Sequence, residues 1–398
     1  MNITETAKNR ALTERLGAFS AQEPFHLMPE EKPAPGGRPE PGPAVEPVEF
    51  LADGSAVLRM AADPDARVAV STGRLSAYRF EGEMRDRGDG VFEITVPANT
   101  AFRGNTVLEF SVNGASVVHP FLPVQIVSGH ICNCIEVPDW ETPYVLMRDV
   151  PHGAVTREVF WSETIQDYAR CLVYTPPMYS RGGDYPVLYL QHGAGENETC
   201  WTFNGKTPHI LDNLIADGKC VPFIVVMNNG MLKKPGQTGQ NDEVIEGIIC
   251  EDCRRYIEER YRVRRDKWGR AVAGLSLGSV QASYIGLRHP ELFSAIGAFT
   301  FICRRDSDHP YEGKPYLDAL KDPERFWKDY KAFFRSVGGA EAQLKGFEED
   351  DVFLRQCGID AGPNYHRHVY PGMAHNWNCW RRALCDFAQV VFQWGEMG

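Results

Sequence analysis

Residues 274–278 read G-L-S-L-G, a G-x-S-x-G pentapeptide whose serine, Ser276, could act as a nucleophile. The apolar residues before it are typical of a strand, and the stretch after it, SVQASYIGL, begins a helical pattern rich in small residues. A sharp strand-to-helix turn strains such a serine and exposes its hydroxyl, while the flanking glycines let the two backbones pack closely. The pentapeptide alone is a weak signal, but this context favours a nucleophile over an ordinary serine in a glycine-rich turn.

A serine nucleophile needs a base, which in this kind of arrangement comes late in the chain on a loop after a strand. His375 meets this requirement, because a predicted strand ends at Tyr370 and a Pro-Gly turn separates the two. His366 and His368 lie two residues apart inside that strand and could in principle face a metal. We interpret them as ordinary strand residues, and we expect no metal and no cofactor.

A carboxylate must orient the imidazole and stabilise its charged form. Glu341 follows the predicted strand 333–337 and two glycines that allow a sharp turn, so we favour it as the acid. Asp360 is closer to His375 in the sequence but precedes the last strand, and it stays open as the alternative.

Two backbone N–H groups are needed to hold an oxyanion. The residue after the nucleophile, Leu277, supplies one candidate. The sequence QHGAG at 191–195 ends an apolar strand, and we expect the second donor to be the N–H of Ala194. His192 is interpreted as a residue of this turn rather than as a second base.

Strand and helix patterns divide the chain into four parts. Residues 153–398 alternate strands with helices, which predicts a doubly wound, mostly parallel sheet. Residues 48–126 read as short alternating strands with Gly/Asn/Asp turns, which predicts a β-sandwich. Residues 1–47 are predicted to be a helical segment followed by a Pro/Gly-rich linker, and 127–152 to connect the two domains.

The composition narrows the class of protein. The 398 residues carry 42 Lys and Arg against 53 Asp and Glu, a net charge of −11, which argues against nucleic acid or an anionic membrane as partner. The sequence shows no spanning apolar run and no apolar leader at its start. Its 11 cysteines have no framework spacing, so we expect free thiols and a cytoplasmic location. A homo-oligomer is left open.

Longer blocks in 153–398 resemble a known family. They are YPVLYLQHGAGENETCW, HILDNLIADGK, FIVVMNNG, AGLSLGS and YPGMAHNWNCWRRALCDFA, in this order. They resemble the esterase D-like branch of the α/β-hydrolases, and within it carbohydrate esterase family 1, which includes feruloyl and acetyl-xylan esterases. The resemblance implies an α/β-hydrolase fold in which Ser276, His375 and Glu341 form a triad. The family usually has Asp where this chain has Glu341, although related mycolyltransferases use Glu.

The same resemblance extends to two tryptophans and to the first domain. It places Trp201 near the acyl pocket and Trp377 beside the histidine loop, and we expect both to contact substrate. The stretches MRD at 84–86, GVF at 90–92 and EFSVNG at 109–114 resemble early-set, immunoglobulin-like domains related to family-48 carbohydrate-binding modules. Many such domains bind no sugar.

These patterns together predict a serine carboxylic-ester hydrolase that works through an acyl-enzyme. The first substrate expectation is a feruloyl or other hydroxycinnamoyl sugar ester, with a small-molecule or oligosaccharide alcohol. An acetylated xylo-oligosaccharide and a siderophore trilactone are the alternatives. The rival from another class is a non-catalytic carbohydrate-binding protein, which the filled triad positions disfavour.

Overall fold

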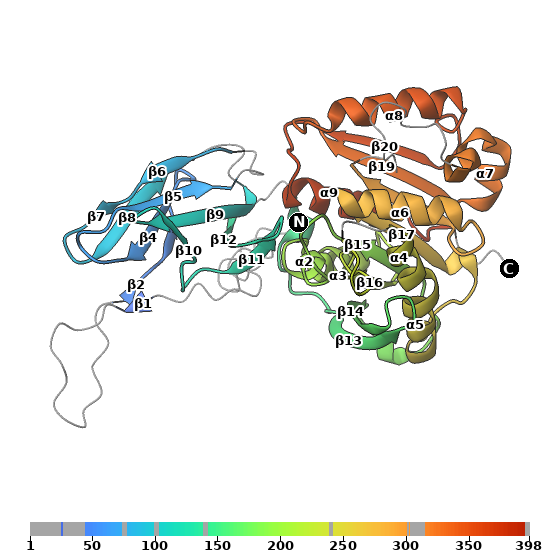
Figure 1. Ribbon diagram of the computed structural model, residues 1–398, viewed down its shortest axis with the longest axis horizontal. Helices are drawn as coiled ribbons and strands as arrows, with labels where there is room; N and C mark the ends of the chain where they lie inside the picture. Colours follow the sequence, from blue (N-terminus) through green and yellow to red (C-terminus); the bar gives the residue numbers. More distant parts are fainter. Residues whose placement is uncertain are drawn as a thin grey trace. The chain divides into compact units, whose positions relative to one another are not determined.

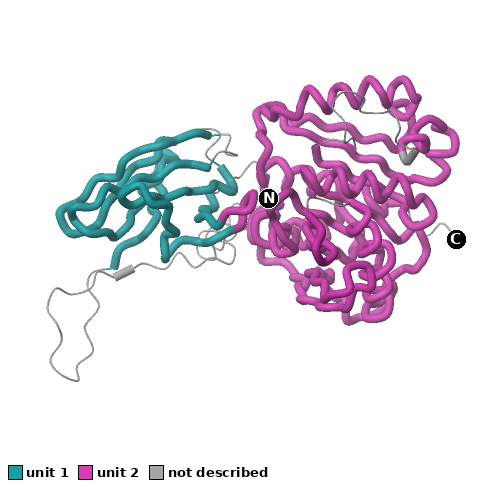
Figure 2. The backbone as a smooth tube through the Cα atoms, in the orientation of Figure 1, with its two compact units in different colours: residues 1–125, 131–141 teal, residues 126–130, 142–398 magenta. Residues whose placement is uncertain are grey.

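A computed structural model describes residues 25–26, 44–73, 78–98, 103–137, 142–238, 242–300, 302 and 315–394. The chain forms two compact units, which comprise residues 1–125 with 131–141, and residues 126–130 with 142–398 (Figure 2). The helical segment and linker predicted over 1–47 lie almost entirely outside the described residues.

A four-stranded and a six-stranded sheet built from antiparallel pairs form the frame of the first unit, beside a separate two-stranded pair of β1 (Phe25–His26) with β2. The four-stranded sheet has the order β3-β4-β8-β7, and the six-stranded sheet has the order β11-β12-β9-β5-β6 with β10 beside β9. Leu58 and Phe110, one from each sheet, belong to a single shared core. The bounds are β2 (Ala44–Val45), β3 (Val48–Phe50), β4 (Ala56–Ala61), β5 (Val68–Thr72), β6 (Glu81–Glu83), β7 (Arg85–Asp86), β8 (Val91–Val96), β9 (Gly104–Val112), β10 (Ala115–Val117), β11 (Val124–Val127) and β12 (His130–Val137). The region is β-rich as expected, and its immunoglobulin-like character stays a prediction.

The predicted end of this domain at residue 126 is too early. Strand β12 lies in the stretch expected to be a connection, yet it pairs with β9 inside the six-stranded sheet. Its polar Asn133 interrupts the apolar pattern that would reveal a buried strand. The Asn133 amide is buried, and hydrogen bonds offset the cost of its burial. Its oxygen accepts the His119 N–H at 2.8 Å, and its nitrogen donates to the His119 carbonyl at 3.0 Å.

An eight-stranded sheet forms the frame of the second unit, with the order β13-β14-β16-β15-β17-β18-β19-β20. Six neighbouring strands are parallel, in the order β16, β15, β17, β18, β19 and β20. Strands β13 and β14 add an antiparallel edge beside β16. The bounds are β13 (Ala154–Ser162), β14 (Asp167–Thr175), β15 (Val187–Gln191), β16 (Ile224–Asn228), β17 (Arg270–Leu275), β18 (Ala295–Phe299), β19 (Ala332–Gly338) and β20 (Tyr365–Tyr370). This is the mostly parallel sheet predicted for 153–398.

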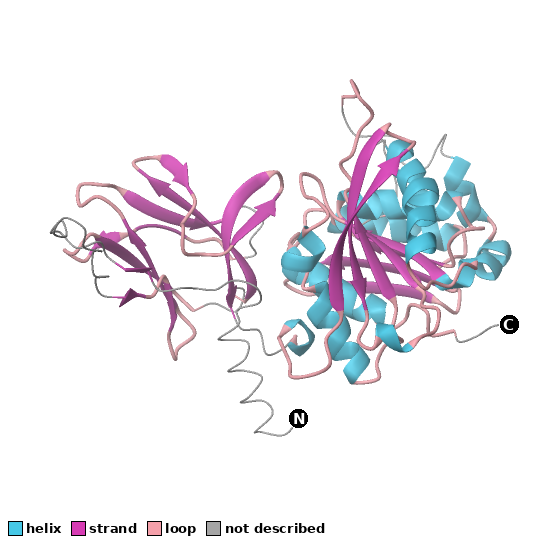
Figure 3. Ribbon diagram, turned by 90° about the horizontal axis from the view of Figure 1, so that it is seen from below, coloured by secondary structure: helices cyan, strands magenta, loops and turns pink. Residues whose placement is uncertain are grey.

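Helices cover both faces of this sheet, as Figures 1 and 3 show. Alternate residues of one strand enter different cores: Tyr189 packs with α5 and α6, and Leu188 packs with α3 and α9. The bounds are α2 (Cys200–Phe203), α3 (Thr207–Ala216), α4 (Asp242–Gly247), α5 (Arg254–Arg260), α6 (Leu277–Arg288), α7 (Pro323–Asp329), α8 (Leu344–Gln356) and α9 (Trp377–Ala388). In such a sheet, functional side chains gather beyond the carboxyl ends of the parallel strands.

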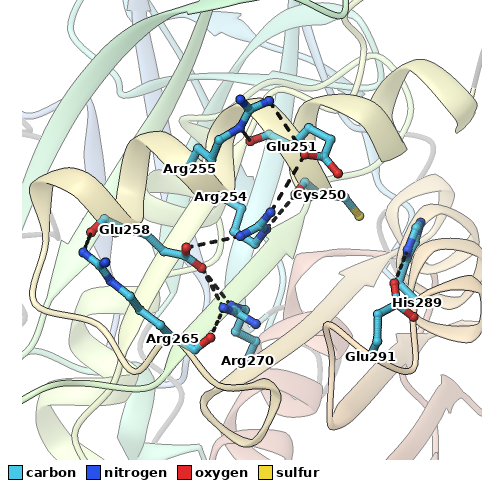
Figure 4. A network of polar contacts seen from close by, with 9 residues as sticks. All are labelled: Cys250, Glu251, Arg254, Arg255, Glu258, Arg265, Arg270, His289 and Glu291. Carbon is cyan, nitrogen blue, oxygen red and sulfur yellow. Dashed lines mark hydrogen bonds and ion pairs between the residues drawn. The ribbon is translucent and has the colours of Figure 1, made fainter.

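Cys250 and Cys253 lie within a π-helical segment, Ile248–Cys253, between α4 and α5. Both thiols are buried, and the segment does not begin a helix directly after a strand, as a redox pair would require. Figure 4 shows the neighbouring ion pairs, in which Glu258 contacts Arg254 at 3.2 Å and Arg270 at 2.8 Å. We interpret the cysteines as packing residues of this helix.

Candidate active site

Ser276 lies at the turn between β17 and α6, with φ 49° and ψ −117°. A positive φ is strained for a residue with a side chain, and such strain is concentrated at functional sites. The Ser276 N–H donates to the carbonyl of Phe299 at the end of β18 at 3.2 Å, which anchors the turn to the sheet. This is the geometry that the G-x-S-x-G pattern predicts.

The flanking glycines are required by close backbone approach. A β-carbon at Gly278 would lie 2.5 Å from the His192 carbonyl oxygen, and one at Gly274 would lie 2.3 Å from the Gly278 carbonyl oxygen. Neither distance is tolerated for backbone atoms, so a larger residue would push α6 away from β15. The elbow therefore needs both glycines to bring the start of α6 against the loop after β15.

Ser276, His375 and Glu341 form a continuous chain of hydrogen bonds. His375 Nε2 lies 3.0 Å from Ser276 Oγ, and His375 Nδ1 lies 2.6 Å from Glu341 Oε2. A carboxylate only accepts, so Nδ1 carries the proton, and Nε2 is left to accept the serine hydroxyl. The structure thus brings together three side chains that the sequence places on three separate loops.

Glu341 is held by more than the imidazole. Its second oxygen, Oε1, accepts the Gly338 N–H at 2.8 Å and lies 3.5 Å from Cys379 Sγ. Burial beside this carboxylate raises the pKa of the Cys379 thiol, so the thiol stays a neutral donor. The alternative acid, Asp360, instead contacts Arg355 at 3.4 Å.

The two residues expected to supply the oxyanion donors are Leu277, which follows the serine, and Ala194, whose loop borders it. Leu277 is the first residue of α6, where an N–H has no partner within the helix. The turn 193–196 is closed by the Glu196 N–H donating to the Gly193 carbonyl at 3.3 Å, with Gly195 at φ 74°. A β-carbon at Gly193 would lie 3.5 Å from Ser276 Cβ, so the loop carrying Ala194 borders the nucleophile.

His192 is fixed in this turn and is not a base. Its Nε2 accepts the Gly230 N–H at 2.9 Å, so Nδ1 carries the proton and contacts the Gly193 carbonyl at 2.8 Å. Burial lowers the pKa of His192 to about 4, which keeps the ring neutral. The structure agrees with the interpretation of His192 as a turn residue.

Trp201 and Trp377 are buried in the structure, and their expected contact with substrate stays a prediction. Their exposed fractions are 1% and 2%. The Trp201 indole donates to the Gln191 carbonyl at 2.9 Å and packs edge-to-face on Trp377, with centroids 5.2 Å apart. Trp380 extends the cluster and packs against the His375 ring at 5.0 Å. The tryptophans pack against one another and against the His375 ring, and the burial of their large apolar rings stabilises this cluster.

Sequence analysis missed two residues that contact this arrangement. Cys379 lies in the first turn of α9, four residues after His375, and its thiol contacts Glu341. Glu196 lies three residues after Gly193, the same spacing that separates Glu341 from Gly338. That repeated G-x-x-E spacing was the available signal.

No metal site accompanies these residues within the described part of the chain. His366 and His368 stack on Phe334, with centroids 6.4 Å and 4.8 Å apart. Burial lowers the pKa of both imidazoles. They behave as strand residues of β20.

Comparison with known proteins places the chain in a family. The model of the Esterase family matches residues 162–389, more than half of the chain. The chain belongs to this esterase family. The match covers every side chain of the Ser276–His375–Glu341 arrangement.

Two relatives align with this chain over only part of their own length. An endo-1,4-β-xylanase/feruloyl esterase of Xylanibacter ruminicola is 36% identical over 269 residues, which is 65% of this chain and 34% of the relative. Endo-1,4-β-xylanase Y of Acetivibrio thermocellus is 23% identical over 248 residues, 55% of this chain and 21% of the relative. The chain therefore spans about a third or less of the length of these relatives.

Solved structures give the fold of the esterase. A ferulic acid esterase, 25% identical, has a TM-score of 0.52 and covers 61% of this chain and 98% of its own. The enterobactin esterase of Shigella flexneri, 16% identical, has a TM-score of 0.61 and covers 87% of this chain and 95% of its own. The second unit therefore has an α/β-hydrolase type of fold. Within the described ranges, no helix combines the length and apolar composition needed to cross a membrane.

Proposed function

We propose that this esterase is a serine carboxylic-ester hydrolase that works through Ser276, His375 and Glu341. The observation that carries the proposal is the hydrogen-bond chain from Ser276 Oγ to His375 at 3.0 Å and from His375 to Glu341 at 2.6 Å. The strained serine at a helix N-terminus and the family match support the same chemistry.

The proposed reaction has two half-reactions. Ser276 Oγ attacks the ester carbonyl carbon while its proton passes to His375 Nε2. The N–H groups of Leu277 and Ala194 hold the oxyanion, and the imidazolium is stabilised by Glu341. The alcohol leaves with the proton from Nε2. Water then attacks the acyl-enzyme by the same route, releasing the acid and restoring the serine.

For the substrate we propose a feruloyl or related hydroxycinnamoyl ester of a sugar. The support is the relative named endo-1,4-β-xylanase/feruloyl esterase and the ferulic acid esterase structure. An acetylated xylo-oligosaccharide is the alternative from the same class. A siderophore trilactone is kept as a further alternative, because the fold likeness to the enterobactin esterase extends over 87% of the chain.

A hydrolysis panel tests this proposal. The purified chain is assayed with methyl ferulate, acetylated xylan, enterobactin and p-nitrophenyl acetate, each beside the Ser276→Ala variant. We expect Ser276-dependent release of ferulate at the highest kcat/KM. Preference for acetylated xylan or for the trilactone would replace the substrate, and activity unchanged in Ser276→Ala would contradict the serine mechanism.

A further inference from the structure

Two Gly-x-x-Glu turns flank the segment that bears His375. In the turn 338–341, the glycine N–H donates to the glutamate side chain at 2.8 Å, and the glutamate N–H donates to the glycine carbonyl at 3.1 Å. The turn 193–196 repeats both bonds, at 3.1 Å and 3.3 Å. The same hydrogen-bonded turn therefore holds one carboxylate after β19 and another after β15.

The remaining oxygen of each carboxylate reaches the same short segment. Glu341 Oε2 contacts His375 Nδ1 at 2.6 Å, and Glu196 Oε1 accepts the indole N–H of Trp377 at 3.0 Å. Trp377 is the first residue of α9 and follows His375 by two positions. The proposed catalytic histidine is thus held from one side by Glu341, and its segment is tied from the other side by Glu196.

Glu196 also sets the position of the loop that carries Ala194. Its Oε2 accepts the N–H of Gly193, and its own N–H closes the turn on the Gly193 carbonyl. Gly193 borders Ser276, so a shift of this turn would move the Ala194 N–H relative to the serine. An oxyanion donor acts only if it points at the position where negative charge develops.

Neutral N–H dipoles, rather than a cation, face the Glu196 carboxylate. Within the described residues no Lys or Arg forms an ion pair with it, and its contacts are the Gly193 and Trp377 N–H groups. The titratable groups nearby are Glu198 on the same loop, Cys200 at the start of α2 and His192 before the turn. On α9, Cys379 faces Glu341, and His375 lies two residues before Trp377.

We propose that Glu196 is a positioning residue which, in its ionised form, ties the oxyanion loop to the histidine-bearing segment. This inference rests on the proposed function of Ser276, His375 and Glu341. An ionised carboxylate accepts two N–H bonds, whereas a carboxylic acid has only one good acceptor and must place its own O–H. Protonation of Glu196 would therefore release either Gly193 or Trp377.

Burial raises the pKa of Glu196 to about 7, and the two N–H donors only partly offset this. The site then needs two groups deprotonated at once, Glu196 and His375. On the acid limb, the logarithm of kcat/KM should approach a slope of two against pH. A histidine acting alone would give a slope of one.

The test compares pH profiles of p-nitrophenyl acetate hydrolysis for the whole chain, read at the isosbestic wavelength. Glu196→Gln keeps the size and shape of the side chain, but only its amide oxygen can accept a hydrogen bond. Its NH₂ group then faces either the Gly193 N–H or the Trp377 N–H, and two donors cannot pair. We expect kcat to fall by about 10²-fold with KM changed little, because an oxyanion contact acts in the transition state. The acid-limb slope should fall from two to one.

A second variant keeps the test valid if Glu196→Gln does not fold. Trp377→Phe keeps an aromatic ring in the cluster and removes the N–H that stabilises the ionised carboxylate, together with part of the buried ring. We expect its acid limb to move up by about one pH unit. The matched control is Glu158→Gln, a buried carboxylate on β13 that accepts from Tyr256 and Tyr261 at 2.6 Å each, and it should change neither slope nor midpoint.

Three results would overturn the role of Glu196. The first is an acid-limb slope of one in the pH profile of wild-type kcat/KM. The second is a slope that stays at two in Glu196→Gln. The third is an acid limb in Trp377→Phe at the same pH as in the wild type. A wild-type chain that hydrolyses no ester would contradict the proposed function itself and remove this role with it. A Ser276-dependent esterase with unaltered profiles would contradict Glu196 alone.

Discussion

Replacing Glu341 with Gln tests the acid of the proposed triad without changing the size of the side chain. The amide oxygen can still accept the Gly338 N–H, which Glu341 Oε1 now accepts at 2.8 Å. The amide NH₂ then faces His375 Nδ1, where the carboxylate oxygen lies at 2.6 Å. An NH₂ can only donate there, so Nδ1 loses its proton and Nε2 gains it. A protonated Nε2 cannot accept the serine proton.

We therefore expect kcat to fall by about 10⁴-fold, as for the Asp-to-Asn change in a serine-protease triad. At about 1.36 kcal/mol per tenfold, this is about 5.4 kcal/mol of transition-state stabilisation. The assay is steady-state hydrolysis of p-nitrophenyl acetate, with circular dichroism to verify folding. Asp360→Asn is the control, because Asp360 contacts Arg355 rather than the imidazole, and it should be nearly silent. A folded Glu341→Gln within tenfold of wild type would refute this reasoning.

Three further predictions concern the nucleophile, metals and a surface histidine. Ser276→Ala should lower kcat by about 10⁴–10⁶-fold, because the covalent route is lost, and retention of a hundredth of the rate would exclude it. EDTA should leave the rate unchanged, and a chelator-sensitive rate would revive a metal role for His366 and His368. Hydrogen bonds to Cys250 and Glu246 raise the pKa of His289 from 6.5 to about 11, so its stabilisation is complete below about pH 6.5 and is lost as pH rises through about 11. His289→Gln should therefore destabilise more at about pH 6 than at about pH 9 by chemical denaturation, and equal losses would contradict the shift.

The central side chains could be predicted because each is marked by its own local pattern. Ser276 lies between glycines that the close backbone approach requires, and His375 follows a strand and a Pro-Gly turn. Glu341 could be placed by the strand before it, since β19 ends at Gly338. Strand ends of a parallel sheet meet at one edge, so these separate patterns converge.

Properties that depend on distant partners were not predicted. The burial of Trp201 and Trp377 follows from their packing on each other, across residues far apart in the sequence. The tie from Glu196 to Trp377 joins the loop after β15 to the start of α9, and no local pattern reports it. Strand β12 was missed because its buried Asn133 is satisfied by backbone groups of a separate segment, those of His119, Leu122 and Pro123.

Covalent labelling tests the central claim most directly. The whole chain is treated with a fluorophosphonate, digested, and mapped by mass spectrometry, beside the Ser276→Ala and His375→Ala variants. The proposed mechanism predicts a single adduct on Ser276 in the wild type, none in Ser276→Ala, and strongly slowed labelling in His375→Ala. An adduct on another serine, or full ester hydrolysis by a chain whose Ser276 stays unlabelled, would contradict it.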